Sequence, residues 1–174
     1  QPAAAMAAED PMGEEICRHY IRNLFYPFKP RAADMGRDFN WTFNPVPPNS
    51  PDFTYEWTWC AISRMQFWRT LGDAYWKTRN ENYAREWVAQ LLDFARKHPA
   101  PERPETAGPT LWRSLDSSER MYDSWPYAYA HFLNSPSFTP EAQWIYLRMI
   151  RDHGRLLTAG LADQNRSNNW VSSE

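Results

Sequence analysis

The stretch Glu56–Tyr75, EWTWCAISRMQFWRTLGDAY, decides how the rest of this 174-residue chain is interpreted. Apolar and aromatic residues recur in it at the spacing of one helix face: Trp57, Ala61, Trp68, Leu71 and Tyr75. This period predicts one long helix with a buried stripe, ending near Lys77–Thr78. Polar groups also stand among the aromatic rings, namely Glu56, Arg64 and Asp73. They lie either on a solvated face or in a cleft that holds a sugar.

Helical patterns flank this stretch on both sides. Pro11–Tyr26 carries an apolar stripe that Pro27 ends, and Asn82–His98 has its own apolar face. Only the turn Arg79–Glu81 separates the central helix from the second of these, so we expect the two to run antiparallel.

Two more helical regions follow a proline-rich loop at 99–109. The first runs from about Ser114 to Leu133, and Pro126 predicts either a kink inside it or two helices that meet there. Thr139-Pro140-Glu141 is a helix start signal, for a helix that runs to about Leu157.

The pattern predicts an all-α fold, because no segment shows convincing strand alternation. Long connections at 31–52 and 99–109 suit antiparallel helix pairs of a layered or toroidal α/α fold better than a compact bundle. We expect residues 1–10 to be a flexible N-terminus and 11–174 to form one domain.

Composition excludes several functions and favours one. A net charge of −2 argues against a nucleic-acid partner, and no apolar run is long enough to span a membrane. The four histidines show no zinc spacing, no cofactor motif occurs, and Cys17 and Cys60 define no disulfide framework. We therefore expect no metal and no cofactor. Aromatic residues make up 16% of the chain, and this richness fits either an aromatic core or carbohydrate binding.

Two polar groupings could carry chemistry. Asp116 and Asp123 lie two helical turns apart, as a carboxylate pair for glycoside hydrolysis would, although Asp116 also fits an ordinary helix N-cap. Asn168-Asn169-Trp170 places two amides beside a ring, which suits either a polar cradle for an anion or a plain N-cap.

Four segments together resemble the N-terminal domain of the heparinase II/III family of polysaccharide lyases, most closely its heparan-sulfate lyases. They are EWTWCAISRMQFWRTLGDAYWKT, YAREWVAQLLDFARKHP, LWRSLDSSERMYDSWPYAYAHFLNSPSFTPE and NRSNNWVSSE. The resemblance extends from about Phe39 to the end. Its most specific parts are the W-x-x-LG-x-AYW-x-T segment and the terminal NNW.

The resemblance implies an incomplete (α/α) toroid followed by a β-sandwich domain, and β-elimination at a uronic acid. Asn169, with Asn168 as the alternative register, would neutralise the uronate carboxylate. The resemblance also implies a set of candidate substrate-binding residues: Arg64, Trp112, Arg120, Trp125, Tyr127 and Trp170. Core packing and structural salt bridges are the alternative roles for these side chains. Ser63-Arg64-Met65 departs from the family pattern.

The family's catalytic tyrosine and histidine would lie beyond Glu174, so we expect this chain to be an inactive fragment of a longer protein. Its expected partners are an acidic polysaccharide and the missing C-terminal part, and its expected location is the periplasm or outside the cell. Two rival functions remain open at this stage. One is an α/α glycoside hydrolase that uses Asp116 or Asp123, and the other is a non-catalytic helical glycan-binding module.

Overall fold

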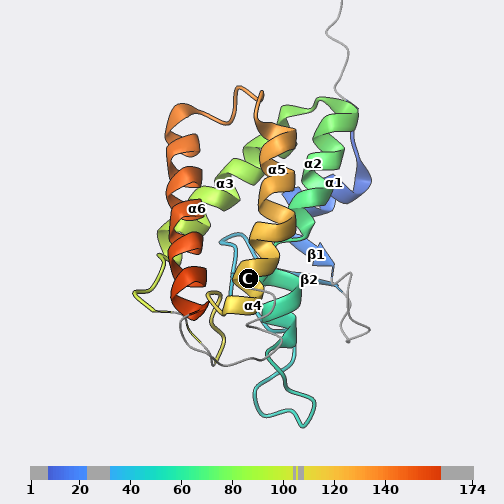
Figure 1. Ribbon diagram of the computed structural model, residues 1–174. Coiled ribbons are helices and arrows are strands. Elements are labelled where there is room, and N and C mark those ends of the chain that lie inside the picture. The colour runs from blue at the N-terminus through green and yellow to red at the C-terminus, as the bar shows by residue number, and fades with distance from the viewer. Residues whose placement is uncertain (1–7, 23–31, 104, 106–107, 162–174) are drawn as a thin grey trace, which may run out of the picture.

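The computed structural model describes residues 8–22, 32–103, 105 and 108–161, and they form a set of helices packed side by side (Figure 1). The elements in chain order are α1 (Pro11–Cys17), β1 (Tyr20–Arg22), β2 (Ala32–Asp34), η1 (Trp57–Ser63), α2 (Phe67–Thr78), α3 (Glu81–Lys97), α4 (Ser114–Glu119), η2 (Arg120–Ser124), α5 (Trp125–Phe132) and α6 (Pro140–Leu161). The elements η1 and η2 are π-helical.

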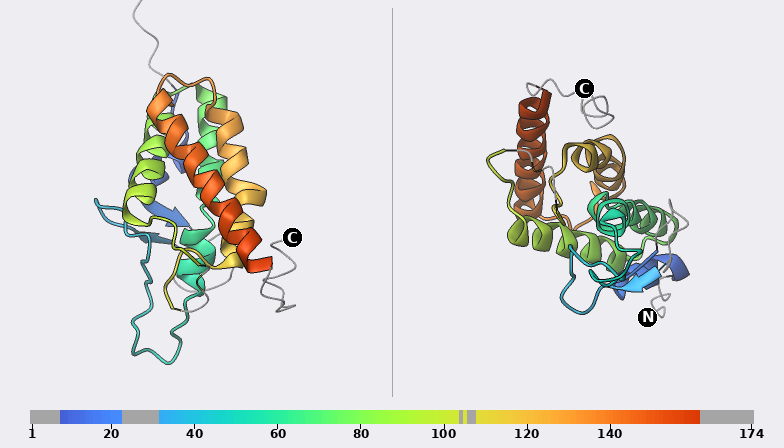
Figure 2. Two further views of the ribbon diagram at one scale, coloured as in Figure 1. Left: turned by 60° about the vertical axis from the view of Figure 1, so that its left-hand side comes forward. Right: turned by 90° about the horizontal axis from the view of Figure 1, so that it is seen from below.

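Antiparallel helix pairs form the body of the domain, as the sequence predicts. The chain rises through α2 and descends through α3, then rises through α4, η2 and α5 and descends through α6 (Figure 1). Helix α2 packs against α5 and α3, and α3 packs against α6, as the turned views also show (Figure 2). Helix α1 packs against α2 and α3, and strand β1 of the small sheet packs against α1 and η1.

Side chains cap two of the helices, and the cap at Thr139 confirms the predicted start signal. Asn80 caps α3, which begins one residue before the predicted start at Asn82, by accepting a hydrogen bond from the Asn82 backbone N–H at 3.0 Å. Thr139 accepts one from the Ala142 N–H at 3.4 Å, and α6 then continues to Leu161, past the expected end. Pro126 lies in the first turn of α5, where its missing N–H costs little.

The central helix is interrupted, contrary to the single helix that we expected. It consists of η1 and α2, and between them Met65 adopts a left-handed backbone with φ of 52°. Tertiary contacts hold this break: Met65 is fully buried and its sulfur accepts the Trp125 Nε1–H at 3.2 Å. The predicted stripe is nevertheless buried on both sides of the break.

The first helix is shorter than predicted, because it ends at Cys17. His19 then turns the chain with φ of 59°, and its ring contacts the Gly36 carbonyl at 2.7 Å and Glu86 at 3.1 Å. The residues Tyr20–Arg22 pair antiparallel with Ala32–Asp34 and bury Ile21 completely. The expectation of no strand was therefore wrong for this two-stranded sheet.

The N-terminal boundary also differs from our expectation, because Asp10 is part of the packed domain. Its carboxylate caps α1 by accepting from the Met12 and Gly13 backbone N–H groups, and it pairs with Lys77 at 3.0 Å. Its own N–H lies 2.6 Å from the Tyr83 hydroxyl oxygen, which accepts this bond.

The core is built mainly from aromatic rings. Trp87 is fully buried and stacks on Phe132 with 4.8 Å between ring centroids. Its edges meet Phe138 at 4.8 Å and Trp68 at 6.0 Å. These contacts join α3, α2, α5 and the segment before α6 in one core.

Gly13→Ala is expected to lower the free energy of unfolding by about 1–3 kcal/mol. An added Cβ would lie 2.8 Å from Ala74 Cβ on α2 and 2.8 Å from Tyr83 Cε1 on α3. Gly154 of α6 is the matched control, because nothing lies within 4 Å of a Cβ there. Gly154→Ala should therefore raise stability by up to about 1 kcal/mol. Urea unfolding checks both values, and equal stability of the two variants would contradict the close packing of α1.

Candidate functional site

Three arginines gather around one buried carboxylate where η1, α4 and η2 meet. Asp116 of α4 is fully buried. Its Oδ1 accepts the Arg64 Nε–H at 2.9 Å, and its Oδ2 lies 3.4 Å from Arg113 Nε. Arg64 directly follows η1, and Arg113 directly precedes α4. We call Arg64, Arg113, Asp116 and Arg120 the arginine cluster.

Arg120 is the buried member of this cluster and ties three segments together. Its guanidinium donates to the Ser63 carbonyl at 2.8 Å and to the Leu111 carbonyl at 2.7 Å. It also donates to the Ser117 hydroxyl at 3.0 Å and, through Nε, to His153 Nε2 at 2.9 Å. Burial lowers the pKa of Arg120 to about 9, and the charge of Asp116 opposes this shift. Arg120 therefore has a structural role.

Trp112 and Trp125 lie in the core as well. The Trp112 indole N–H donates to the His98 carbonyl at 3.2 Å, and that of Trp125 points at the Met65 sulfur. The Trp125 side chain is fully buried and that of Trp112 is 3% exposed. The expected cleft role is therefore not supported for Trp112, Trp125 or Arg120, because a buried side chain presents no surface to a polysaccharide.

Tyr127 belongs to a different, more exposed group on α2 and α5. Its hydroxyl donates to Asp73, its ring stacks on His131 with 4.2 Å between centroids, and Arg69 lies 4.2 Å above it. The hydrogen bond to Asp73, together with desolvation, raises the pKa of Tyr127. Of the predicted binding residues, the structure thus brings Arg64 and Arg120 together through Ser63 and Asp116, and it places Tyr127 elsewhere.

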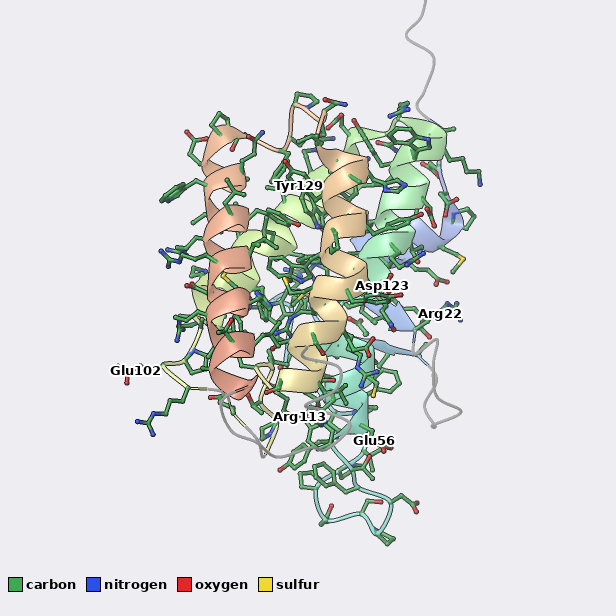
Figure 3. All side chains as sticks on the ribbon, in the orientation of Figure 1. Arg22, Glu56, Glu102, Arg113, Asp123 and Tyr129 are labelled. Atoms are coloured by element: carbon green, nitrogen blue, oxygen red, sulfur yellow. The ribbon has the colours of Figure 1, made fainter. Side chains whose placement is uncertain are left out.

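The two aspartates do not form a pair for hydrolysis. Asp116 is the third residue of α4, and Arg113 occupies the N-cap position, so the N-cap interpretation was wrong. Asp123, which is labelled in Figure 3, pairs instead with Arg69 of α2, and its side chain is 19% exposed. A fully buried Asp116 cannot reach a glycosidic oxygen, and no contact within the described residues joins the two carboxylates.

Sequence reasoning missed Arg113, which the structure places beside Trp59. The Arg113 guanidinium carbon lies 3.7 Å from the centroid of the Trp59 ring, which is close enough for a cation–π contact. The spacing of Arg113 and Asp116 is i, i+3, which brings side chains together at the start of a helix. This spacing could have indicated the ion pair.

Other predicted features fall outside the structure or have no counterpart in it. Asn168, Asn169 and Trp170 lie outside the described residues. No group of three or more potential metal ligands occurs at 8–22, 32–103, 105 or 108–161. None of the described helices has the length and hydropathy that crossing a bilayer requires.

His153 makes the stability of this region depend on pH. Its Nδ1–H donates to the Met149 carbonyl at 2.7 Å, and its Nε2 accepts from Arg120. Complete burial, together with the nearby charge of Arg120, holds the pKa of His153 well below 6.5. Below pH 6.5 the unfolded chain binds a proton there that the native chain does not. Stability should therefore fall with falling pH by up to about 1.4 kcal/mol per pH unit from this residue.

Urea unfolding at pH 7.5, 6.5 and 5.5 tests this dependence. His153→Gln keeps an acceptor for Arg120 and should flatten the slope relative to the wild type. His19 has the opposite effect, because the hydrogen bond to Glu86 raises its pKa, and that contribution is common to both proteins. An unchanged slope in His153→Gln would contradict the assignment.

Comparison with known proteins gives consistent matches. The profile of the heparinase II/III N-terminus matches residues 5–174. The chain is 32% identical over 165 residues to a heparin-sulfate lyase of Pedobacter heparinus and 29% identical over 150 residues to one of Bacteroides stercoris. These alignments cover 94% and 76% of this chain, but 24% and 21% of the two relatives.

Solved structures agree with the sequence matches. The crystal structure of a heparan sulfate lyase from Pedobacter heparinus has a TM-score of 0.75 and 28% identity, over 99% of this chain and 26% of that one. A heparinase III gene product with methylated lysines has a TM-score of 0.73, over 93% of this chain and 26% of its own. At 24% identity the latter shows the fold alone.

The chain thus spans about a quarter of the length of these relatives. Its mostly helical structure and its similarity to the solved structure from Pedobacter heparinus confirm the predicted fold class, antiparallel helix pairs of an incomplete toroid. Because the family profile covers residues 5–174, the chain belongs to the heparinase II/III family, whose N-terminal domain it matches.

Proposed function

We propose that this chain is the N-terminal toroid part of a polysaccharide lyase that cleaves a glycosaminoglycan of the heparin or heparan sulfate type. The observation that carries the proposal is the alignment with the heparin-sulfate lyase of Pedobacter heparinus, which covers 94% of this chain at 32% identity. No contact of Asp116 or Asp123 favours the hydrolase alternative.

The proposed reaction is β-elimination at a uronic acid. Asn169, or Asn168 in the alternative register, donates hydrogen bonds to the uronate carboxylate and stabilises the negative charge that develops as the C5 proton leaves. A base removes that proton, the bond from C4 to the glycosidic oxygen breaks, and the oxygen receives a proton as it departs. The base and the acid would come from the rest of the protein, so the chain alone is proposed to be inactive.

Among the described candidates, Arg64 is best placed to bind an anionic sugar. Its Nε is fixed by Asp116, and its side chain is 14% exposed. Arginine suits sulfate and carboxylate groups because its planar fork binds them with two parallel hydrogen bonds. Trp170 and Tyr127 remain proposed contacts. The proposed location is the periplasm or outside the cell, where such polymers occur.

An ultraviolet assay for the unsaturated uronate product tests the function. The 174-residue chain and the complete protein would be incubated side by side with heparan sulfate and with alginate. We expect product from the complete protein with heparan sulfate, and none from the chain alone. Absence of product from both proteins on both polymers would contradict the lyase assignment. Product from the isolated chain would contradict its proposed inactivity.

A further inference from the structure

The arginine cluster holds more positive than negative charge. Arg64, Arg113 and Arg120 surround Asp116, and the only bonded carboxylate among the described residues of this cluster is that of Asp116. The hydrogen-bond partners of Arg120 are neutral carbonyls, hydroxyls and an imidazole. Glu119 adds only a weaker attraction toward Arg64. Charged groups taken from water are normally paired, so one anion for three cations leaves the cluster incompletely compensated.

Two of the three guanidiniums remain able to bind a further group. The side chains of Arg64 and Arg113 are 14% and 12% exposed, whereas Arg120 is fully buried. Each of these two arginines contacts Asp116 through Nε. The Nη groups of Arg64 and Arg113 make no hydrogen bond with the residues that the structure describes. Half-buried guanidinium N–H groups without acceptors favour an anion from outside the chain.

A row of half-buried aromatic rings adjoins Arg113. Its guanidinium lies on Trp59, the Trp59 ring is 5.6 Å from Tyr55, and Tyr55 is 5.1 Å from Phe53. The Trp59 ring is fixed at its other side, because its indole N–H donates to the Gly108 carbonyl at 3.2 Å. Figure 3 shows Arg113 at the lower end of the molecule, beside α4 and on the same end as Glu56. Flat apolar rings next to cations suit the C–H face of a charged sugar.

We propose that Arg113 and Arg64, flanked by the Trp59 ring, form a binding site for a sulfate or carboxylate group of an acidic saccharide. Asp116 is a positioning residue there, because its Oδ1 accepts the Arg64 Nε–H and its Oδ2 attracts Arg113 Nε from 3.4 Å without a hydrogen bond, which leaves the Nη groups to the ligand. The saccharide as the source of this anion rests on the proposed function. The site itself rests on the charges and contacts of the cluster.

Binding of a fluorescently labelled heparin hexasaccharide to the 174-residue chain tests the site, by fluorescence anisotropy at constant salt. Arg113→Gln should weaken binding at least about tenfold, the loss expected when hydrogen bonds to a charged group disappear. Arg113→Lys keeps the charge but loses the planar fork, so its affinity for the hexasaccharide should lie between those of the wild type and Arg113→Gln. Circular dichroism and thermal unfolding establish that each variant is folded.

Arg151→Gln is the matched control, because Arg151 is an exposed arginine on α6 that pairs with Asp152. Arg151→Gln removes the same charge as Arg113→Gln. It should change the affinity for the hexasaccharide less than twofold if the loss in Arg113→Gln comes from the site and not from the net charge. An uncharged chitohexaose should show no binding that depends on Arg113. Wild-type affinity in Arg113→Gln, an equal loss in Arg151→Gln, or no binding by the wild type would each overturn the inference.

This experiment separates the site from the enzymatic function. Loss of hexasaccharide binding in Arg113→Gln, combined with a complete protein that forms no unsaturated product, would support the site and contradict the lyase proposal. Lyase activity of the complete protein, combined with unchanged hexasaccharide binding in Arg113→Gln, would support the lyase proposal and contradict the site.

Discussion

Asp116→Asn is expected to lower the free energy of unfolding by about 3–5 kcal/mol, the loss measured when one partner of a buried ion pair is removed. Asparagine keeps the size of the side chain and one carbonyl oxygen, so the change removes mainly the charge. Arg64, Arg113 and the fully buried Arg120 would then share no bonded anion in the cluster. Urea unfolding with linear extrapolation gives the difference.

Asp123→Asn is the control, because Asp123 lies in η2, the segment that directly follows α4. Asp123 pairs with Arg69, whose side chain is 45% exposed, so water screens this pair and its loss should cost less than about 1 kcal/mol. Similar losses in the two variants would show that Asp116 does not compensate the buried arginines.

Asn169→Ala in the complete protein is expected to slow product formation about 10²–10³-fold, the range for removing one donor that stabilises a developing anion. The proposed reason is that the uronate carboxylate would lose the amide that neutralises it. Initial rates at saturating heparan sulfate, followed by ultraviolet absorbance, measure the effect on turnover.

Asn168→Ala distinguishes the two registers of the asparagine pair. If Asn169 is the neutralising residue, Asn168→Ala should retain most of the activity. The reverse result would assign the role to Asn168. Near wild-type rates in both single variants would contradict the proposed role of this pair.

The sequence predicted the helix pairs because their apolar periods are long and regular. The stripe from Trp57 to Tyr75 and the turn at Arg79–Glu81 were enough to place α2 against α3. The break at Met65 could not be predicted, because it depends on Trp125 and on Leu111, which accepts the Ser63 hydroxyl at 3.2 Å. These partners lie about fifty residues or more away in the sequence. The sheet at Ile21 likewise depends on a partner strand that has no alternation of its own.

The candidate site was predicted only in part. Arg64 and Arg120 were both predicted to bind substrate, and the structure leaves the side chain of Arg64 14% exposed but buries Arg120 fully. Arg120 is buried because it donates to neutral acceptors on separate segments, among them Ser63, Leu111 and His153. The local sequence around Arg120 does not indicate these distant partners. Arg113 was overlooked because its aromatic neighbour in space, Trp59, precedes it by more than fifty residues.

The two π-helical segments have a consequence for comparing relatives. A π-helical turn holds one residue more than the α-helical turn that it replaces, because its hydrogen bonds run from i to i+5. Relatives with regular α-helix at Trp57–Ser63 or Arg120–Ser124 would therefore align only with a one-residue gap there. Single-residue deletions in these segments should accordingly be tolerated in evolution more readily than deletions within α3 or α6, where one lost residue would rotate the buried face out of register.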